Sequence, residues 1–276
     1  MSRISTTDVM TFKSLPTPFS MVTAYDYPTA KLADQAEIPI LLVGDSLGMV
    51  VLGYESTVEV TIQDMVHHTK PVVRGSSSAM VVSDMPFMSY HESPQNTMRN
   101  AALLIQQGGA GAVKLEGGRA ICNTITSLVD AGIPVMSHIG LTPQSVHALG
   151  GFKLQGNTEK SAKVLIEDAK AVEAAGAFAV VLELVPAQLS QIITDLLTIP
   201  TIGIGAGPNC DGQVQVSHDI LGLSVDYTPR HAKKYTNCGA LELKAFTDYK
   251  TEVEQGTFPA ASNYRNLDPT VLKHLQ

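Results

Sequence analysis

Short apolar runs alternate with longer amphipathic stretches along the whole chain. The apolar runs predict eight strands, at residues 19–26, 39–45, 79–86, 111–118, 134–140, 177–186, 201–207 and 213–219. Between them, apolar residues recur at helical spacing, as at residues 27–37, 93–109 and 158–177. Eight strand-then-helix units without a break in composition predict an α/β fold, a single (β/α)8 TIM barrel that spans residues 1–276 as one domain.

The two ends of the chain add to this expectation. A short N-terminal helix is expected before the first strand, and the segment from residue 239 onward predicts a C-terminal helical extension with a surface end that contains Pro and Asn. A doubly wound open sheet is the alternative fold. It suits about six units better than eight, and no GxGxxG motif follows the first strand, so the barrel is favoured.

Composition and charge limit the classes of protein to which the chain can belong. Of 276 residues, 44% are hydrophobic and 16% are charged, with a net charge of −7 and no basic block, so neither nucleic acid nor a membrane surface is an expected partner. No apolar run approaches the roughly 20 residues that cross a bilayer, and the N-terminus lacks the apolar core of a signal peptide. Three widely spaced cysteines form no CxxC motif. We therefore expect a cytoplasmic protein with reduced thiols.

Ionisable side chains occur at the carboxyl ends of five successive predicted strands. In chain order they are Asp45, Asp84, Lys114 with Glu116, His138 and Glu183. Lys114 and Glu116 lie two positions apart, so both side chains leave their strand on the same face. Singly, each residue has an ordinary explanation, such as a helix cap at Asp45 and Ser46 or a turn at Asp84. Because the active site of such a barrel lies at the carboxyl ends of its strands, the set together indicates a catalytic site.

Three of these side chains are carboxylates on neighbouring strands, namely Asp45, Asp84 and Glu116. Adjacent strands lie only about 4.8 Å apart, so the negative charges would repel one another and favour protonation. A divalent cation removes this conflict. Oxygen ligands favour a hard ion, and carboxylates with room left for water or substrate suit Mg²⁺ better than Zn²⁺. The pattern therefore predicts a magnesium site.

The remaining charged residues suggest roles toward a substrate. We expect Lys114 to face the anionic end of the substrate. Glu183, in "VVLELVP", is flanked by apolar residues. Burial raises the pKa of a carboxylate toward the range of a general base, so Glu183 is the candidate base, with a salt bridge to a barrel lysine as the alternative.

Three further features have open interpretations. The glycines at positions 203, 205 and 207 either bind phosphate through backbone N–H groups or relieve a bend in the barrel wall. His67 and His68 lie on a predicted helix, where surface or interface packing is expected. His218, on the short and polar eighth strand, has no assigned role.

Several segments resemble the ketopantoate hydroxymethyltransferase family, in the order in which the family has them, from about residue 20 to about residue 240. They include "LLVGDSLGMVVLGY", "AVKLEGG", "HIGLTPQSVHALGGFKLQG", "FAVVLELVPAQL" and "TIGIGAGPNCDGQV". The resemblance implies a (β/α)8 barrel that assembles as a homodecamer. It also implies transfer of a hydroxymethyl unit from 5,10-methylenetetrahydrofolate to 3-methyl-2-oxobutanoate, which gives 2-dehydropantoate on the route to pantothenate.

The resemblance also implies roles for individual residues, by position. The Mg²⁺ ligands of the family match Asp45, Asp84 and Glu116, the last bound directly or through a water. Its contacts to the oxo acid match Asp45, Ser46, Asp84 and Lys114, and a pocket residue matches His138. Its proton acceptor matches Glu183.

Three other interpretations stay open. In a class I aldolase Lys114 would form a Schiff base, which needs a lysine of lowered pKa, whereas Glu116 on the same face would keep it charged. A Mg-dependent 2-oxo acid lyase or mutase of the phosphoenolpyruvate mutase type shares the barrel, but its "KxCG"-type loop does not occur in the sequence. In a binding or scaffold barrel, the charges would only satisfy one another.

Overall fold

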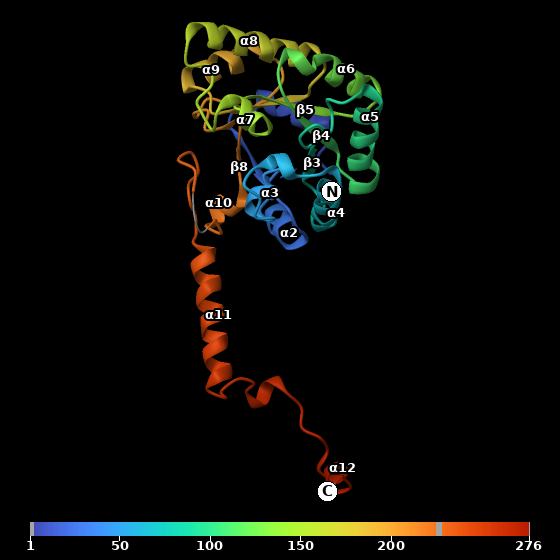
Figure 1. Cartoon of the computed structure of the whole chain (residues 1–276), viewed down its shortest axis with the longest axis vertical. Helices are drawn as coiled ribbons and strands as arrows, with labels where there is room; N and C mark the ends of the chain where they lie inside the picture. The colour runs from blue at the N-terminus through green and yellow to red at the C-terminus, as the bar shows by residue number, and fades with distance from the viewer. Residues whose placement is uncertain (1–2, 225–227, 276) are drawn as a thin grey trace.

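Eight parallel strands close into a barrel in the computed structural model, which describes residues 3–224 and 228–275 (Figure 1). Each strand pairs with the next, and β8 pairs with β1. The strands are β1 Phe19–Thr23, β2 Ile40–Val43, β3 Met80–Asp84, β4 Ala112–Glu116, β5 Val135–Gly140, β6 Ala179–Glu183, β7 Thr201–Ile204 and β8 Gly212–Gln215. The predicted (β/α)8 TIM barrel is confirmed, although most predicted ranges include turn residues at the strand ends.

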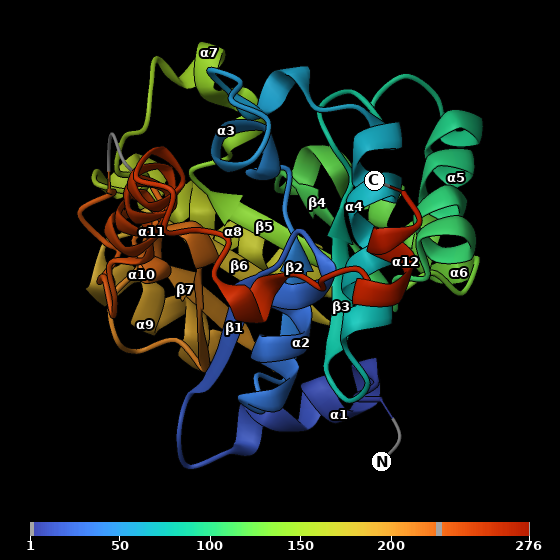
Figure 2. The ribbon, with the colours of Figure 1, turned by 90° about the horizontal axis from the view of Figure 1, so that it is seen from below.

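Helices surround the strands on the outside of the barrel (Figure 2). The α-helices are α1 Thr6–Thr11, α2 Tyr27–Gln35, α3 Leu47–Val50, α4 Ile62–Gly75, α5 Pro94–Ala102, α6 Cys122–Asp130, α7 Val146–Leu149, α8 Glu159–Ala174, α9 Ala187–Leu196, α10 Ser217–Leu221, α11 Cys238–Glu254 and α12 Pro269–Lys273. The helices predicted at 27–37, 93–109 and 158–177 correspond to α2, to α5 with a π-helical continuation, and to α8. Within residues 3–224 and 228–275, no helix has the length and apolar character needed to cross a membrane.

Alternate side chains of each strand point into the barrel. In β4, Ala112 packs in the interior apolar cluster, whereas Val113 and Leu115 pack in the cluster between the strands and the helices. Lys114 and Glu116 share the face of Ala112, so both side chains enter the barrel, as the sequence predicts. The alternation therefore brings polar side chains into the barrel at the carboxyl ends of its strands.

The helix α1 covers the opposite, amino-terminal end of the barrel (Figure 2). Ser5 caps this helix: its hydroxyl accepts from the backbone N–H of Asp8, and the Asp8 carboxylate accepts from the backbone N–H of Ser5. Val9 of α1 is fully buried in the interior cluster. The expected N-terminal helix is confirmed, and it closes the end of the barrel that lies away from α3 and α7.

The connection between β7 and β8 contradicts the prediction of eight strand-then-helix units. Residues 205–211 join the two strands without a helix. Gly205 and Gly207 have φ values of +63° and +83°, which allow the chain to turn sharply. A Cβ on Gly207 would lie 2.4 Å from the Cβ of Ala187. These contacts favour the interpretation that the glycines relieve a tight bend.

The eighth strand is shorter than predicted. It ends at Gln215, and His218 lies in α10, where its ring centroid is 5.4 Å from that of Tyr25. His67 of α4 is exposed, and His68 Nδ1 lies 2.7 Å from the backbone oxygen of Tyr25. His68 therefore packs against its own chain, at the residues that follow β1.

The C-terminal extension leaves the barrel and projects away from it along α11 (Figure 1). α11 begins at Cys238, and nearly all of residues 256–275 are exposed, which agrees with the predicted helix and surface end. Leu241, Leu243 and Phe246 of α11 are 64%, 67% and 69% exposed. So many exposed apolar side chains on one helix are unusual for a surface that faces only water.

Asp34 of α2 links this helix to the turn before β3. Its carboxylate accepts hydrogen bonds from the backbone N–H groups of Ser77, Ser78 and Ala79 and from the hydroxyls of both serines. Burial alone would raise the pKa of Asp34, but these hydrogen bonds hold it well below its usual range. Because the pKa is lower in the folded chain, this stabilisation is present above about pH 4 and is lost as the pH falls through the lowered value.

We expect Asp34→Ala to lower the free energy of unfolding by about 1–3 kcal/mol at neutral pH, because five donors lose a charged acceptor. Thermal unfolding followed by circular dichroism measures the change. Asp130→Ala, at the exposed end of α6, is the control and should stay within about 0.5 kcal/mol of the parent chain. Equal melting temperatures for the two variants would contradict the role assigned to Asp34.

Candidate active site

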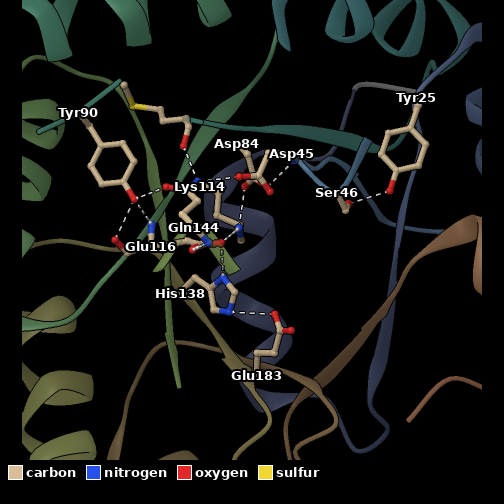
Figure 3. A network of polar contacts seen from close by, with 11 residues as sticks. Tyr25, Asp45, Ser46, Asp84, Tyr90, Lys114, Glu116, His138, Gln144 and Glu183 are labelled. Carbon is tan, nitrogen blue, oxygen red and sulfur yellow. Dashed lines mark hydrogen bonds and ion pairs between the residues drawn. The ribbon is translucent and has the colours of Figure 1, made fainter. Parts of the chain in front are cut away.

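Every residue that the sequence predicts for the site lies at the carboxyl end of the barrel. They are Asp45 and Ser46 after β2, Asp84 at the end of β3, Lys114 and Glu116 in β4, His138 in β5 and Glu183 at the end of β6. Hydrogen bonds and ion pairs connect all of them except Ser46 into one network (Figure 3). The structure therefore brings residues from five strands into a single cluster.

Lys114 is a buried cation within this cluster. Its Nζ lies 2.7 Å from Asp84 Oδ1 and 4.0 Å from Glu116 Oε1. The strand register explains the shorter contact, since Asp84 of β3 is paired with Lys114 of β4. Burial lowers the pKa of Lys114, but Asp84, Glu116 and Asp45 raise it more, so it lies above its usual value. The sequence suggested Glu116 as the partner of Lys114, and the structure shows that Asp84 is closer.

Asp45 and Asp84 lie at the ends of neighbouring strands. The backbone N–H of Asp45 donates to Asp84 Oδ2 over 3.0 Å, and both side chains are buried. Burial, together with the charges of Asp84 and Glu116, raises the pKa of Asp45 well above its usual value. Burial also raises the pKa of Asp84, although Lys114 offsets part of this effect. The cluster thus contains the crowding of carboxylates that the sequence predicts.

His138 lies between two carboxylates. Its Nδ1 is 3.4 Å from Glu116 Oε1, and its Nε2 is 3.3 Å from Glu183 Oε2. These are ion-pair distances, and neither buried nitrogen has a partner in hydrogen-bond geometry. Burial and Lys114 lower the pKa of His138, but the two carboxylates raise it to about 9. The partner of Glu183 is therefore this imidazolium and not the lysine considered from the sequence.

Two neutral residues that the sequence analysis missed complete the cluster. Gln144, in a turn after β5, donates to the carboxylates of Asp45 and Glu116, and the hydroxyl of Tyr90 lies 2.8 Å from Gln144 Oε1. Burial raises the pKa of Glu116, but His138, Lys114 and the backbone N–H of Gln144 bring it below its usual value. The segment "GLTPQSV" directly after a predicted strand was the available signal, but an uncharged amide in a loop gives no indication of its partners.

Ser46 lies at the edge of the cluster and contacts a third residue that the sequence analysis missed. Its Oγ is 2.8 Å from the hydroxyl of Tyr25, which is fully buried after β1. Burial raises the pKa of Tyr25 above its usual value, so the phenol stays protonated. The Tyr25 hydroxyl therefore fixes the position of the Ser46 side chain.

The chemistry of the cluster fits a divalent cation, although its carboxylates do not surround one point. Within residues 3–224 and 228–275, no three His, Cys, Asp or Glu side chains converge as metal ligands. Lys114 contacts both Asp84 and Glu116, so the predicted set of three is not assembled as such. Four buried or nearly buried carboxylates nevertheless face two cationic side chains. A hard cation beside Asp45 and Asp84 would offset the excess negative charge.

Solved structures with a similar fold include two enzymes that share little sequence with this chain. Phosphoenolpyruvate phosphomutase from Streptomyces platensis subsp. rosaceus has a TM-score of 0.60 and 15% identity, over 98% of this chain and 94% of that one. A phosphonopyruvate hydrolase in complex with oxalate and Mg²⁺ has a TM-score of 0.57 and 11% identity, over 98% and 95%. At these identities the likeness concerns the fold alone.

Comparisons of sequence, unlike those of fold, show the family to which the chain belongs. The family model described as ketopantoate hydroxymethyltransferase matches residues 3–261. The 3-methyl-2-oxobutanoate hydroxymethyltransferase of Dehalococcoides mccartyi is 58% identical over 93% of this chain and 91% of its own length. That of Chloroflexus aurantiacus is 53% identical over 98% of this chain and 95% of its own length. The chain therefore belongs to the ketopantoate hydroxymethyltransferase family and is an enzyme of that family.

Proposed function

We propose that the chain transfers a hydroxymethyl unit from 5,10-methylenetetrahydrofolate to 3-methyl-2-oxobutanoate, with Mg²⁺ as cofactor, and forms 2-dehydropantoate for pantothenate synthesis. Membership of the family supports the reaction as a whole. The observation that carries the mechanism is the buried cluster, in which crowded carboxylates lie beside one buried lysine and Glu183 stands at its edge. Such a cluster can bind an anionic oxo acid and remove a proton from it.

Asp45 and Asp84 would hold the Mg²⁺, because their carboxylates are adjacent and buried and their negative charges repel each other. Glu116 would act through a water, since its oxygens face His138, Lys114 and Gln144. When bound, the ion would supply the positive charge that polarises the keto group and makes the C3 proton of the oxo acid more acidic.

Lys114 and Ser46 would bind the oxo acid as charged and neutral donors. Because the pKa of Lys114 lies above its usual value, its amine stays protonated and does not act as the nucleophile that a Schiff base requires. Its ammonium, next to Asp84, would instead attract the carboxylate of the substrate. The Tyr25 hydroxyl holds Ser46 in place for the same purpose.

Glu183 would act as the general base. Its side chain is 14% exposed, so it can meet a substrate at the mouth of the barrel, and His138 orients it from one side. Glu183 would take the proton from C3, and the resulting carbanionic carbon would form a bond to the one-carbon unit of the folate. Both carbon–nitrogen bonds of the one-carbon unit would break, and water would supply the hydroxyl of the product. Tetrahydrofolate would leave with two protons, one from C3 of the oxo acid and one from the water, so that the atoms balance.

A lyase or mutase of the phosphoenolpyruvate mutase type is the alternative reaction for this barrel. The solved structures of that kind share the fold at 15% identity or less in the two cases above. The hydroxymethyltransferases share 53–58% identity over nearly the whole chain, and this difference favours the transferase. The homodecamer and the cytoplasmic location stay predictions, and the exposed apolar side chains of α11 are compatible with an assembly.

Exchange of the C3 proton for deuterium tests the proposal without folate. The purified chain with 3-methyl-2-oxobutanoate and Mg²⁺ in D₂O is expected to erase the C3 proton signal in NMR, and a chelator is expected to stop the exchange. Added 5,10-methylenetetrahydrofolate should then give 2-dehydropantoate. Absence of both exchange and product in the presence of Mg²⁺ would overturn the proposal.

A further inference from the structure

Gln144 connects two carboxylates of the cluster, those of Asp45 and Glu116, through one uncharged residue. It lies in the turn Pro143–Ser145 after β5 and is only 5% exposed. Its backbone N–H donates to Glu116 Oε2 over 3.0 Å, and its Nε2 donates to Asp45 Oδ2 over 2.8 Å and to the backbone oxygen of Met85 over 2.9 Å (Figure 3). A single residue therefore fixes carboxylates that come from β4 and from the end of β2.

The hydroxyl of Tyr90 holds the amide of Gln144 from its oxygen side. It lies 2.8 Å from Gln144 Oε1, and it also reaches the backbone oxygen and N–H of Glu116 at 3.0 and 3.2 Å. If the amide were flipped, its oxygen would lie against Asp45 Oδ2 and its NH₂ would lose two acceptors. Asp45 and the backbone oxygen of Met85 thus select the orientation of the amide, and the Tyr90 hydroxyl holds it from the oxygen side.

An uncharged donor suits this position because it orients a carboxylate without neutralising it. Lys114 pairs with Asp84 at 2.7 Å, whereas no ion pair to Asp45 occurs in the part of the chain that the structure describes. A lysine or arginine in place of Gln144 would compete with a divalent cation for Asp45. The amide engages Oδ2 of Asp45 by hydrogen bonding and brings no positive charge that would compete with a cation.

We infer that Gln144, oriented by Tyr90, is a positioning residue that holds the carboxylates of Asp45 and Glu116 in place for a divalent cation. This inference rests on the proposed function, because it takes Asp45 as a metal ligand and Glu116 as a group that contacts the metal through water. Residues that hydrogen-bond metal ligands commonly change metal affinity by about 10–100-fold when they are replaced.

Gln144→Met tests the inference, since it keeps the volume of the side chain and the backbone N–H and removes only the amide. Calorimetric titration with Mg²⁺ alone is expected to give a Kd about 10–100-fold higher than in the parent chain. Tyr90→Phe leaves the amide in place but removes its orienting hydroxyl, so a smaller increase is expected. The double variant should weaken Mg²⁺ binding by less than the product of the two single effects, because part of the Tyr90→Phe effect acts through the same amide and part through the backbone of Glu116.

Gln213→Met is the matched control. Gln213 of β8 is partly buried and, like Gln144, donates through Nε2 to a backbone oxygen, that of Gly207, but it has no hydrogen bond to the clustered carboxylates among the described residues. Its Mg²⁺ Kd should equal that of the parent chain, with thermal unfolding recorded for every variant. If Gln144→Met does not fold, Tyr90→Phe carries the test alone.

The outcomes separate the two proposals. If the parent chain binds Mg²⁺ and both Gln144→Met and Tyr90→Phe bind it equally tightly, Gln144 has only a structural role and the inference is overturned, while the proposed function stands. If the parent chain does not bind Mg²⁺, the cofactor of the proposed function is overturned, and the inference about Gln144 is overturned with it. Weaker binding in Gln144→Met with unchanged binding in Gln213→Met supports the inference.

Discussion

Glu183→Gln is expected to stop the exchange of the C3 proton of 3-methyl-2-oxobutanoate, while the chain still folds and still binds Mg²⁺ and the oxo acid. Glutamine keeps the length and shape of the side chain but cannot accept the proton. Loss of a general base lowers the rate by about 100-fold to 10,000-fold. The contact with His138 at 3.3 Å can persist through the amide oxygen, so the cluster need not rearrange. NMR in D₂O measures the exchange rate.

Glu167→Gln is the control for this experiment. Glu167 is an exposed glutamate of α8 that pairs with Lys170 on the outside of the barrel. The rate of C3 proton exchange in Glu167→Gln should equal that of the parent chain. Exchange at the parent rate in Glu183→Gln would show that another group takes the proton, and Glu183 would then lose its proposed role.

The sequence predicts the site well where two simple rules act together. Alternation along β4 places Lys114 and Glu116 on one face, and closure of parallel strands brings Asp84 and His138 to the same end of the barrel. Both rules depend only on strand position, which apolar runs reveal. They place residues in a common region, but they do not specify pairs. The pairing of Lys114 with Asp84 depends on strand register, and it became clear only from the structure.

Loop conformation limits what the sequence can predict. Gln144 and Tyr90 lie in turns after β5 and β3, and they reach the cluster through the path of those turns and not through strand alternation. Neither residue is charged, so neither drew attention as an ionisable group. The helix-free link between β7 and β8 was missed for a related reason, since glycines at 205 and 207 are compatible with both a ligand loop and a sharp bend.

Asp84→Asn is expected to abolish Mg²⁺-dependent exchange and to weaken Mg²⁺ binding by about 100-fold or more, because it removes the charge of one of the two proposed adjacent ligands. Asparagine is preferable to alanine here. Its oxygen can still accept from Lys114 and from the backbone N–H of Asp45, so the buried lysine keeps a neighbour. Titration calorimetry gives the affinity, and NMR gives the exchange rate.

Asp211→Asn is the matched control for Asp84→Asn. Asp211 pairs with Lys13 at 3.0 Å at the amino-terminal side of β8, so it forms a second aspartate–lysine pair, which is partly buried and lies at the opposite end of the barrel. Its replacement should lower the melting temperature without changing the Kd for Mg²⁺. A loss of Mg²⁺ binding in both variants would mean that Asp84→Asn acts through general destabilisation.

Asp84→Asn also distinguishes a metal site from a scaffold in which the charges only satisfy one another. If Mg²⁺ binds the folded parent chain, an ion concentration 100 times the Kd stabilises it by about 2.7 kcal/mol, and the melting temperature rises with Mg²⁺. Asp84→Asn should lose that rise, whatever its own melting temperature. In a scaffold, Asp84→Asn would shift the melting temperature by the same amount with and without Mg²⁺, because the contacts of Asp84 with Lys114 and with the backbone N–H of Asp45 do not depend on the ion. The dependence on Mg²⁺, and not the stability of the variant, therefore decides between the two explanations.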